Sequence, residues 1–432
     1  MKRYFEFAAA IIIMTMAPAS LAEQIAIVPA EKLAARPDVA RALEWFGRNA
    51  AWITETHVKI NEVPSPTFSE RQRALSVKKL LEGTGLKIRV DEIGNVIAER
   101  PGTARTGTEA REVVLVAAHL DTVFPAGTNV TVKRDGVRLV APGMSDNSSG
   151  LAAITAVAHA LHNAKLKTSV TLVLVANVGE EGEGNLRGMR KLMETYKGRV
   201  RAVIAVDGAS IEHVTSMALG SRRYEVSVSG PGGHSWADFG QPNPIHALSR
   251  GVARFVRVKV PSDPRTSFNV GMVEGGTSVN SIPHDAAVKV DLRSESEQEL
   301  QKLETAFKDA MQSGVDEEQA AARERGLNDN GNKLELKVKL LGSRPGGDLP
   351  ADSFLLAAVR SADKQLGLRS RMERSSTDAN IPLSLGIPAI AIGGGGRGGG
   401  SHSLQEWYDP ANREVGLKRL LLTLLAVTGV QE

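Results

Sequence analysis

The chain has 432 residues, of which 42% are hydrophobic, and its formal net charge is +4. This length is sufficient for one large hydrophobic core and a smaller one, so we expect two domains. The small net charge, with no basic stripe interleaved with aromatic residues, argues against a nucleic-acid partner. The absence of cysteine excludes disulfides and thiol chemistry.

The first 22 residues are typical of an export signal. Lys2 and Arg3 precede the apolar stretch AAAIIIMTMA, and Ser20-Leu21-Ala22 places small residues where a signal peptidase cleaves. The apolar stretch has about a dozen residues, fewer than the roughly 20 that span a bilayer, so a transmembrane anchor is the weaker interpretation. We expect cleavage after Ala22, a secreted, periplasmic protein, and no stable membrane insertion after signal removal.

From about residue 40 to 213, helical and strand patterns alternate. ARALEWFGRNAAWITETHVKINEV opens this region as a helix, and ERQRALSVKKLLEGTG forms a second helix that a glycine ends. Short apolar runs indicate buried parallel strands: VVLVAA, VTLVLVANV and VRAVIAV here, and IPAIAI near the end of the chain. The pattern predicts an α/β fold with a doubly wound sheet between helical layers.

A different pattern interrupts this domain. RRYEVSVSG, a helix near 243–260, SFNVGMVEGG, AAVKVDLRS, a charged helix near 295–325 and KLELKVKLLG follow one another. This strand-helix-strand-strand-helix-strand order is that of a ferredoxin-like α+β unit. A helix near 352–367 and the last apolar run come after it. We therefore expect a discontinuous catalytic domain, residues 23–221 and 344–432, with an inserted domain at 222–343.

Short motifs rich in His, Asp and Glu accompany the apolar runs. They are HLDTV at 119–123, GMSDNSSG at 143–150, NVGEEGEG at 177–184, AVDG at 205–208 and GGSHS at 399–403. In open parallel sheets, ligands bind beyond the carboxyl ends of the strands, so these motifs can converge. Two imidazoles and several carboxylates, with no thiol, indicate a metal centre.

The candidate metal ligands are His119, Asp146, Glu181, Asp207 and His402. They supply two terminal ligands for each of two ions and one bridging carboxylate. Glu180 is then left over, and an unligated carboxylate beside a metal-bound water can take its proton and return it to a leaving amine. Asp121, two residues after His119, has the spacing of a group that orients the imidazole through its other ring nitrogen.

Several alternative interpretations are weaker. A single His-x-Asp is common by chance, and an Asp after a strand is often a helix cap, so the inference depends on the motifs in combination. Glu183 lies in a glycine-rich turn and is expected to be solvated. The GGGGRGGG tract could be read as a phosphate-binding loop, but it lacks the Lys-Ser/Thr pair of a nucleotide-binding loop. Its glycines are expected to let the backbone approach the metal site on the way to His402.

The ordered motifs resemble a known family, the co-catalytic zinc exopeptidases and deacylases. This family includes peptidase T, glutamate carboxypeptidase, acetylornithine deacetylase, succinyl-diaminopimelate desuccinylase and carnosinase. Further matches are HSW at 234–236, GGTSVNSIP at 275–283, VDLR ending at Arg293 and SSTDANIP at 375–382. The resemblance covers essentially the whole mature chain. It implies a phosphorylase/hydrolase-like three-layer catalytic domain with an inserted lid or dimerisation domain.

The resemblance also implies a role for each matched residue. It assigns His119 and Asp207 to one ion, Glu181 and His402 to the other, Asp146 to the bridge and Glu180 to the base. Two Zn²⁺ ions per chain are implied, with Co²⁺ or Mn²⁺ as alternatives, and the Asp146–Asn147 peptide bond is expected to be cis.

Three residues of the inserted domain match family positions that act on the substrate. His234 would stabilise the tetrahedral oxyanion, often from the other subunit of a homodimer joined through the insert. Asn280 and Arg293 would contact the substrate, frequently its terminal carboxylate, which an Arg fork fits geometrically.

The sequence therefore predicts a secreted metallo-exopeptidase that hydrolyses a terminal amide bond of short peptides by metal-bound hydroxide, with Glu180 as general base. The main alternative is an N-acyl-amino-acid amidohydrolase, because both reactions attack an amide in the same way. A catalytically inactive metal-binding scaffold is a remote alternative, which Glu180 disfavours. Ser375-Ser376, in place of paired glycines, and the long glycine run before His402 depart from the family pattern near the substrate, so its identity stays open.

Overall fold

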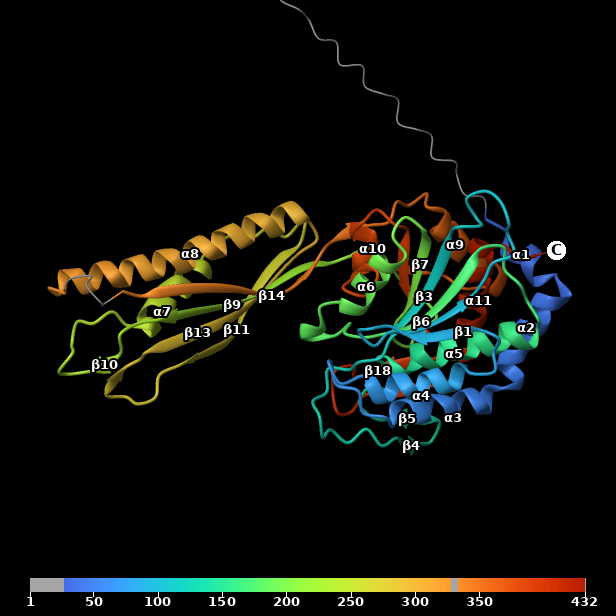
Figure 1. Ribbon diagram of the computed structural model, residues 1–432, viewed down its shortest axis with the longest axis horizontal. Helices are drawn as coiled ribbons and strands as arrows, with labels where there is room; N and C mark the ends of the chain where they lie inside the picture. The colour runs from blue at the N-terminus through green and yellow to red at the C-terminus, as the bar shows by residue number, and fades with distance from the viewer. Residues whose placement is uncertain (1–26, 328–332, 432) are drawn as a thin grey trace, which may run out of the picture.

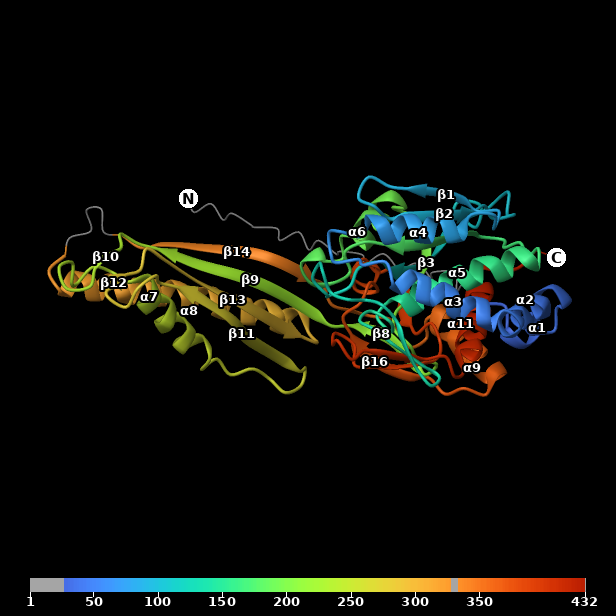
Figure 2. The ribbon, with the colours of Figure 1, turned by 90° about the horizontal axis from the view of Figure 1, so that it is seen from below.

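The computed structural model describes residues 27–327 and 333–431 and shows two units side by side (Figures 1 and 2). One unit contains a nine-stranded mixed sheet, and the other is an elongated unit with a four-stranded sheet. The predicted signal at residues 1–22 lies outside the described residues. Within the described ranges, no helix is both long enough and apolar enough to cross a membrane.

The nine-stranded sheet contains the predicted parallel core. Its central neighbours are β6 (Thr171–Asn177), β3 (Val113–His119), β7 (Val200–Val206) and β17 (Ala389–Ile392), all parallel. Nearly all of their residues are buried, as continuous apolar runs require. The four strands predicted from these runs are confirmed.

Strands that the sequence analysis did not predict extend this core on both sides. They are β1 (Lys87–Val90) and β2 (Val96–Arg100) on one side, and β8 (His213–Ala218), β15 (Gly347–Asp348) and β16 (Arg371–Ser375) on the other. The pairs β1–β2, β2–β6, β17–β8 and β15–β8 are antiparallel. The whole sheet is therefore mixed.

Helices cover both faces of the sheet. α5 (Ser148–Asn163) packs on β3, β6 and β7, with α4 (Arg71–Leu81) and α11 (Arg413–Thr428) against it. α6 (Arg187–Thr195) lies on the opposite side (Figure 1). The two connections β3–α5–β6 and β6–α6–β7 run in opposite directions along the sheet, so right-handed crossovers place their helices on opposite faces. The three-layer α/β architecture is confirmed.

The N-terminal helical segment is divided where one helix was expected. α2 (Pro37–Arg48) and α3 (Ala50–Asn61) are separated by Asn49, whose φ of −110° and ψ of 19° are not helical. The Asn49 side chain donates to the Trp45 carbonyl at 2.8 Å. Asn competes for backbone groups in this way, which explains the break. The remaining α-helices described in this unit are α1 (Ala30–Ala34), α9 (Phe354–Leu366) and α10 (Asn380–Ser384).

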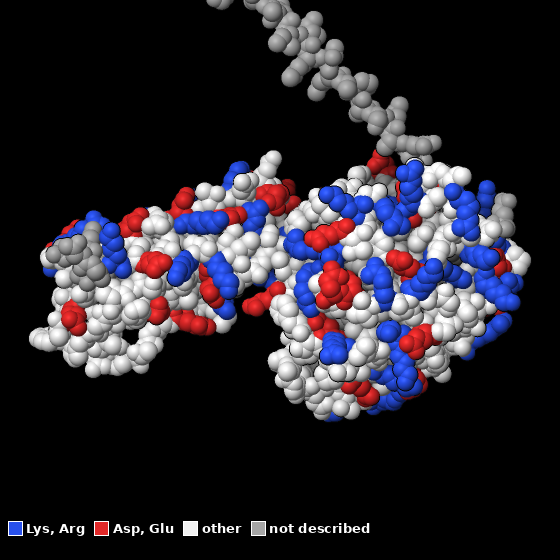
Figure 3. Space-filling model, in the orientation of Figure 1, with Lys and Arg blue, Asp and Glu red and all other residues white. Residues whose placement is uncertain are grey.

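The insert has the predicted element order. Its elements are β9 (Gly220–Ser229), α7 (Pro244–Phe255), β11 (Thr266–Gly275), β13 (Asp285–Ser294), α8 (Glu297–Glu324) and β14 (Glu335–Arg344). The antiparallel sheet runs β11-β13-β9-β14, and α7 and α8 pack together and against it. The predicted boundaries at 222 and 343 fall inside β9 and β14, so two continuous strands connect the units. Lys and Arg are interspersed with Asp and Glu over the face seen in Figure 3.

Two small β structures complete the fold. β18 (Arg397–Gly399), β19 (Trp407–Asp409), β5 (Arg138–Val140) and β4 (Lys133–Asp135) form a four-stranded sheet that ties the chain before Asp146 to the chain around His402. β10 (Gly233–His234) pairs with β12 (Ser281–Ile282) at the far end of the insert (Figures 1 and 2).

Candidate metal centre

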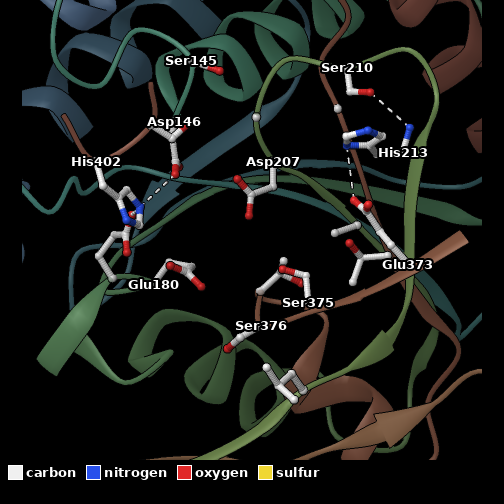
Figure 4. A pocket seen from close by; sticks show the side chains of 18 of the residues that line it. Ser145, Asp146, Glu180, Asp207, Ser210, His213, Glu373, Ser375, Ser376 and His402 are labelled. Carbon is white, nitrogen blue, oxygen red and sulfur yellow. Dashed lines mark hydrogen bonds and ion pairs between the residues drawn. The ribbon is translucent and has the colours of Figure 1, made fainter. Parts of the chain in front are cut away.

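The predicted site residues of the catalytic unit converge at one edge of the sheet. His119 is the last residue of β3, Asp207 follows β7, and Glu180 and Glu181 follow β6. His402 lies between β18 and β19, beyond the glycine run after β17. Asp146 lies just before α5, and Figure 4 shows Asp146, Glu180, Asp207 and His402 around the same cavity.

Asp146 lies between the two imidazoles. Its Oδ1 is 3.1 Å from Nε2 of His119, and its Oδ2 is 3.2 Å from Nε2 of His402. Each imidazole also faces a second carboxylate: Asp207 Oδ1 lies 3.6 Å from His119 Nε2, and Glu181 Oε1 lies 3.2 Å from His402 Nε2. This arrangement leaves room for the predicted pair of metal positions that share Asp146.

The chemistry of these residues fits two divalent cations. Ligand atoms of His119, Asp146 and Glu181 all lie within 4.8 Å of one another. Asp146 Oδ1 is buried and has no well-aligned hydrogen-bond donor among the described residues, so a cation would satisfy it. Burial acts to raise the pKa of Asp146, but the adjacent imidazoles of His119 and His402 outweigh it and lower the pKa. His nitrogen and carboxylate oxygen are the donors that Zn²⁺ takes at catalytic sites.

Metal binding should be strongly pH-dependent and should release protons. Hydrogen bonds to Asp146 and Glu181 raise the pKa of His402 to about 10, so the metal-free imidazole is protonated at neutral pH. A protonated ring competes with a cation, so apparent zinc affinity should keep rising with pH above 6.5, the ordinary His pKa, by up to about tenfold per unit for each displaced proton. Calorimetry at pH 6, 7 and 8 in buffers of different ionisation enthalpy measures this. Binding without proton release at pH 7 would contradict it.

The bridging position predicts a loss of metal on substitution. Asp146→Ala removes the only carboxylate that faces both imidazoles among the described residues, so bound zinc should fall below two ions per chain. Metal analysis after gel filtration measures this. Asp135→Ala, which removes an exposed Asp of β4, is the matched control and should bind as much zinc as the wild type. Equal zinc content in both variants would exclude Asp146 as the bridge.

Glu180 is held by a residue that the sequence analysis did not single out. Its Oε1 accepts a hydrogen bond from Nη1 of Arg344 at 3.0 Å, and its main-chain carbonyl accepts another from Nη2. Burial raises the pKa of Glu180 well above its ordinary value, although Arg344 opposes this. Arg344 is the last residue of β14, so the end of the insert contacts the candidate base directly.

Asp121 lies behind the site and contacts the second ring nitrogen of His119, as expected, and its carboxylate has a further role. The His119 Nδ1 is 3.0 Å from the Asp121 main-chain carbonyl and 3.7 Å from its carboxylate. The carboxylate instead accepts hydrogen bonds from the backbone N–H groups of Glu180 at 3.0 Å and Glu181 at 2.9 Å, and from the Thr67 hydroxyl at 3.0 Å. Asp121 thus orients the imidazole through its backbone and the Glu pair through its side chain.

The cavity beside these residues has a volume of about 500 Å³. Four arginines line it: Arg223, Arg293, Arg344 and Arg374. Arg293 reaches it from β13 of the insert, with Nε donating to Asp291 at 2.6 Å.

The other two residues predicted to act on the substrate lie elsewhere. His234 and Asn280 are exposed and close to each other, since the Ser235 N–H donates to the Asn280 carbonyl at 3.0 Å. They belong to the far end of the insert, away from the cavity of their own chain (Figures 1 and 2).

Comparison with known proteins identifies the family. Residues 115–426 match the family described as Peptidase family M20/M25/M40. The chain belongs to this family. It is 22% identical over 365 residues to the uncharacterised protein YqjE of Bacillus subtilis, covering 80% of this chain and 90% of YqjE. It is 24% identical over 332 residues to acetylornithine deacetylase of Myxococcus xanthus, covering 74% and 79% of the two chains.

The fold is similar to that of a solved peptidase. Aminopeptidase PepT from Bacillus cereus superimposes with a TM-score of 0.67 and 18% identity, over 87% of this chain and 98% of PepT. The M20 family contains dinuclear metal-binding peptidases and related amidohydrolases, so this chain is a metal-dependent hydrolase by family.

Two local features of this M20 chain agree with the sequence analysis. The Asp146–Asn147 peptide bond is cis, as the resemblance implied. The glycine run does bring backbone close to the site: a Cβ at Gly398 would lie 2.2 Å from Ser145 Oγ. A side chain at 398 would therefore displace the turn that carries Asp146.

Other residues around the site of this M20 chain carried no predicted role. Asp378, within SSTDANIP, is buried, accepts a hydrogen bond from the Asn177 amide at 2.7 Å and has its pKa raised to about 6 by burial. His213 lines the far side of the cavity, with Nδ1 3.3 Å from Glu373 Oε1 (Figure 4). The SSTDANIP motif marked the segment of Asp378 without giving that residue a role, and no local pattern marks His213.

Proposed function

We propose that this protein is a two-zinc exopeptidase that removes a terminal residue from short peptides. The observation that carries the proposal is the position of Glu180. It is a buried carboxylate beside the shared Asp146 site, held by Arg344 rather than by either imidazole, and it lines the cavity. A metal-binding scaffold has no use for such a group. Two divalent ions held around Asp146 by the two imidazoles and the neighbouring carboxylates would supply the Lewis acidity that makes a water more acidic and the scissile carbonyl more electrophilic.

The chain's own residues perform the remaining tasks of hydrolysis. Water adds across the amide: its oxygen bonds to the carbonyl carbon, the C–N bond breaks, and the amine nitrogen gains a proton. Glu180 accepts the proton from water and delivers it to the departing nitrogen. Asp121 and Arg344 fix the position of Glu180 through the contacts described above. Arg293, which lines the cavity, binds a terminal carboxylate.

The insert supports a proposal about assembly. Because His234 is remote from the cavity of its own chain, we propose that it acts in the cavity of a second copy, in a homodimer joined through the insert. Asn280, beside it, contacts the substrate of the same partner cavity.

A deacylase is the second candidate, and the similarity to acetylornithine deacetylase favours it. To separate the two, purified residues 23–432 loaded with zinc are incubated with dipeptides, tripeptides and N-acyl amino acids, and products are identified by mass. Release of one terminal residue from peptides supports the exopeptidase and shows which end is cleaved. Exclusive cleavage of N-acyl groups supports the deacylase. No turnover by a metal-replete protein would support the scaffold.

Export is a separate proposal. The charged and apolar N-terminal pattern supports secretion to the periplasm, with removal of residues 1–22. Mass spectrometry of protein from a periplasmic extract should give Glu23 as the first residue. An intact Met1 in soluble cytosolic protein would refute it.

A further inference from the structure

The loop that carries Asp146 and the loop that carries His402 are joined by a buried carboxylate. Glu406 is 0% exposed and lies four residues after His402. Its Oε2 accepts a hydrogen bond from the Gly143 N–H at 2.8 Å. Its Oε1 accepts from the N–H groups of Ser145 and Asp146, both at 2.7 Å.

The backbone around Glu406 reinforces this connection. The Glu406 carbonyl accepts from the Ala141 N–H at 3.0 Å, and β19 begins at the next residue by pairing with β5. On the other side, the Glu406 N–H donates to Ser403, and the Ser403 N–H donates to Gly400. The turn from His402 to Glu406 is therefore compact, and a shift of one residue would move the other.

A carboxylate is suited to this position because it only accepts hydrogen bonds. It offers about four lone-pair sites on two oxygens, enough for three converging N–H groups. Hydrogen bonds to an ionised acceptor are about twice as strong as neutral ones. A glutamine has the same shape but places an NH₂ group where one carboxylate oxygen now accepts. At least one of the three backbone N–H groups would then lose its acceptor.

We propose that Glu406 is a positioning residue that fixes the separation of Asp146 and His402 and thereby sets the affinity of the metal centre. Asp146 must face both imidazoles at about 3 Å, and the two ligand loops are far apart in the sequence. The side chain of Glu406 holds the turn of Asp146 to the loop of His402. This inference rests on the proposed metal centre but requires no particular substrate.

The test measures zinc affinity rather than turnover. Metal-free wild type, Glu406→Gln and Asp363→Asn are titrated with zinc against a chromophoric chelator, and the Tm of each metal-free protein is recorded. Asp363→Asn is the matched control, because Asp363 is a buried carboxylate bonded to Arg419 on the α9–α11 side, outside the metal loops. Loss of an outer-shell partner of a metal ligand typically costs about 10- to 100-fold in affinity.

Glu406→Gln should bind at least one of the two zinc ions about 10- to 100-fold more weakly, while Asp363→Asn binds both as the wild type does. Excess zinc should restore part of the lost turnover, which a general folding defect would not allow. A folded Glu406→Gln protein with wild-type affinity for both ions would overturn the proposal.

If Glu406→Gln does not fold, the zinc affinity of Glu406→Asp tests the proposal instead. Aspartate keeps the negative charge but has a shorter side chain, so wild-type zinc affinity in Glu406→Asp would overturn the proposal equally. Wild-type protein that binds no zinc would refute the metal centre and this role together. Zinc binding without peptide hydrolysis would refute only the proposed activity.

Discussion

Glu180→Gln should lower turnover by about 100-fold or more while leaving zinc content near that of the wild type. Glutamine cannot carry a proton from water to the leaving amine. It does keep an oxygen that can accept the hydrogen bond of Arg344, so the buried guanidinium keeps a partner. Steady-state kinetics with a hydrolysed peptide, together with metal analysis of the same sample, measure both quantities.

The control for this prediction lies three residues away. Glu183 is exposed in the turn after the Glu pair, and Glu183→Gln removes the same charge without touching the cavity. It should retain wild-type turnover. A metal-replete Glu180→Gln enzyme as active as Glu183→Gln would remove Glu180 from the mechanism.

His234→Ala should lower turnover by about 100-fold or more, although His234 lies far from the cavity of its own chain. The His234 Nδ1 accepts from the backbone N–H groups of Trp236 at 3.2 Å and Ala237 at 3.3 Å, which leaves Nε2 as the donor of the neutral ring. A donor aimed at an oxyanion acts only on charge that develops in the transition state, so kcat should fall more than KM rises. His284→Ala, an exposed histidine at the same end of the insert, is the control and should be fully active.

Subunit mixing tests whether His234 acts in a partner. Inactive Glu180→Gln and inactive His234→Ala proteins, mixed so that subunits exchange, should regain part of the activity. Each mixed dimer pairs one intact Glu180 cavity with one intact His234. A fully active monomer, or no recovery despite demonstrated exchange, would refute action in trans.

Only part of the candidate site could be predicted from local sequence. Four continuous apolar runs require strands buried on both faces, and parallel neighbours end at one edge, so His119, Glu181, Asp207 and the approach to His402 had to lie near one another. The alternation of strand and helix patterns likewise determined the element order of the insert. These features follow from periodicity, which each segment carries by itself.

The other contacts of the candidate site follow only from the tertiary structure. Arg344 contacts Glu180, which is 164 residues away in the sequence, and Glu406 contacts Asp146, which is 260 residues away. No local sequence pattern predicts either contact. The small sheet that joins β5 to β19 depends on pairing between distant short strands, and the Asp121 carboxylate faces the Glu pair because of how two loops pack. Backbone periodicity determines which face of a segment is buried, but only the assembled chain determines which side chain a buried polar group finds as its partner.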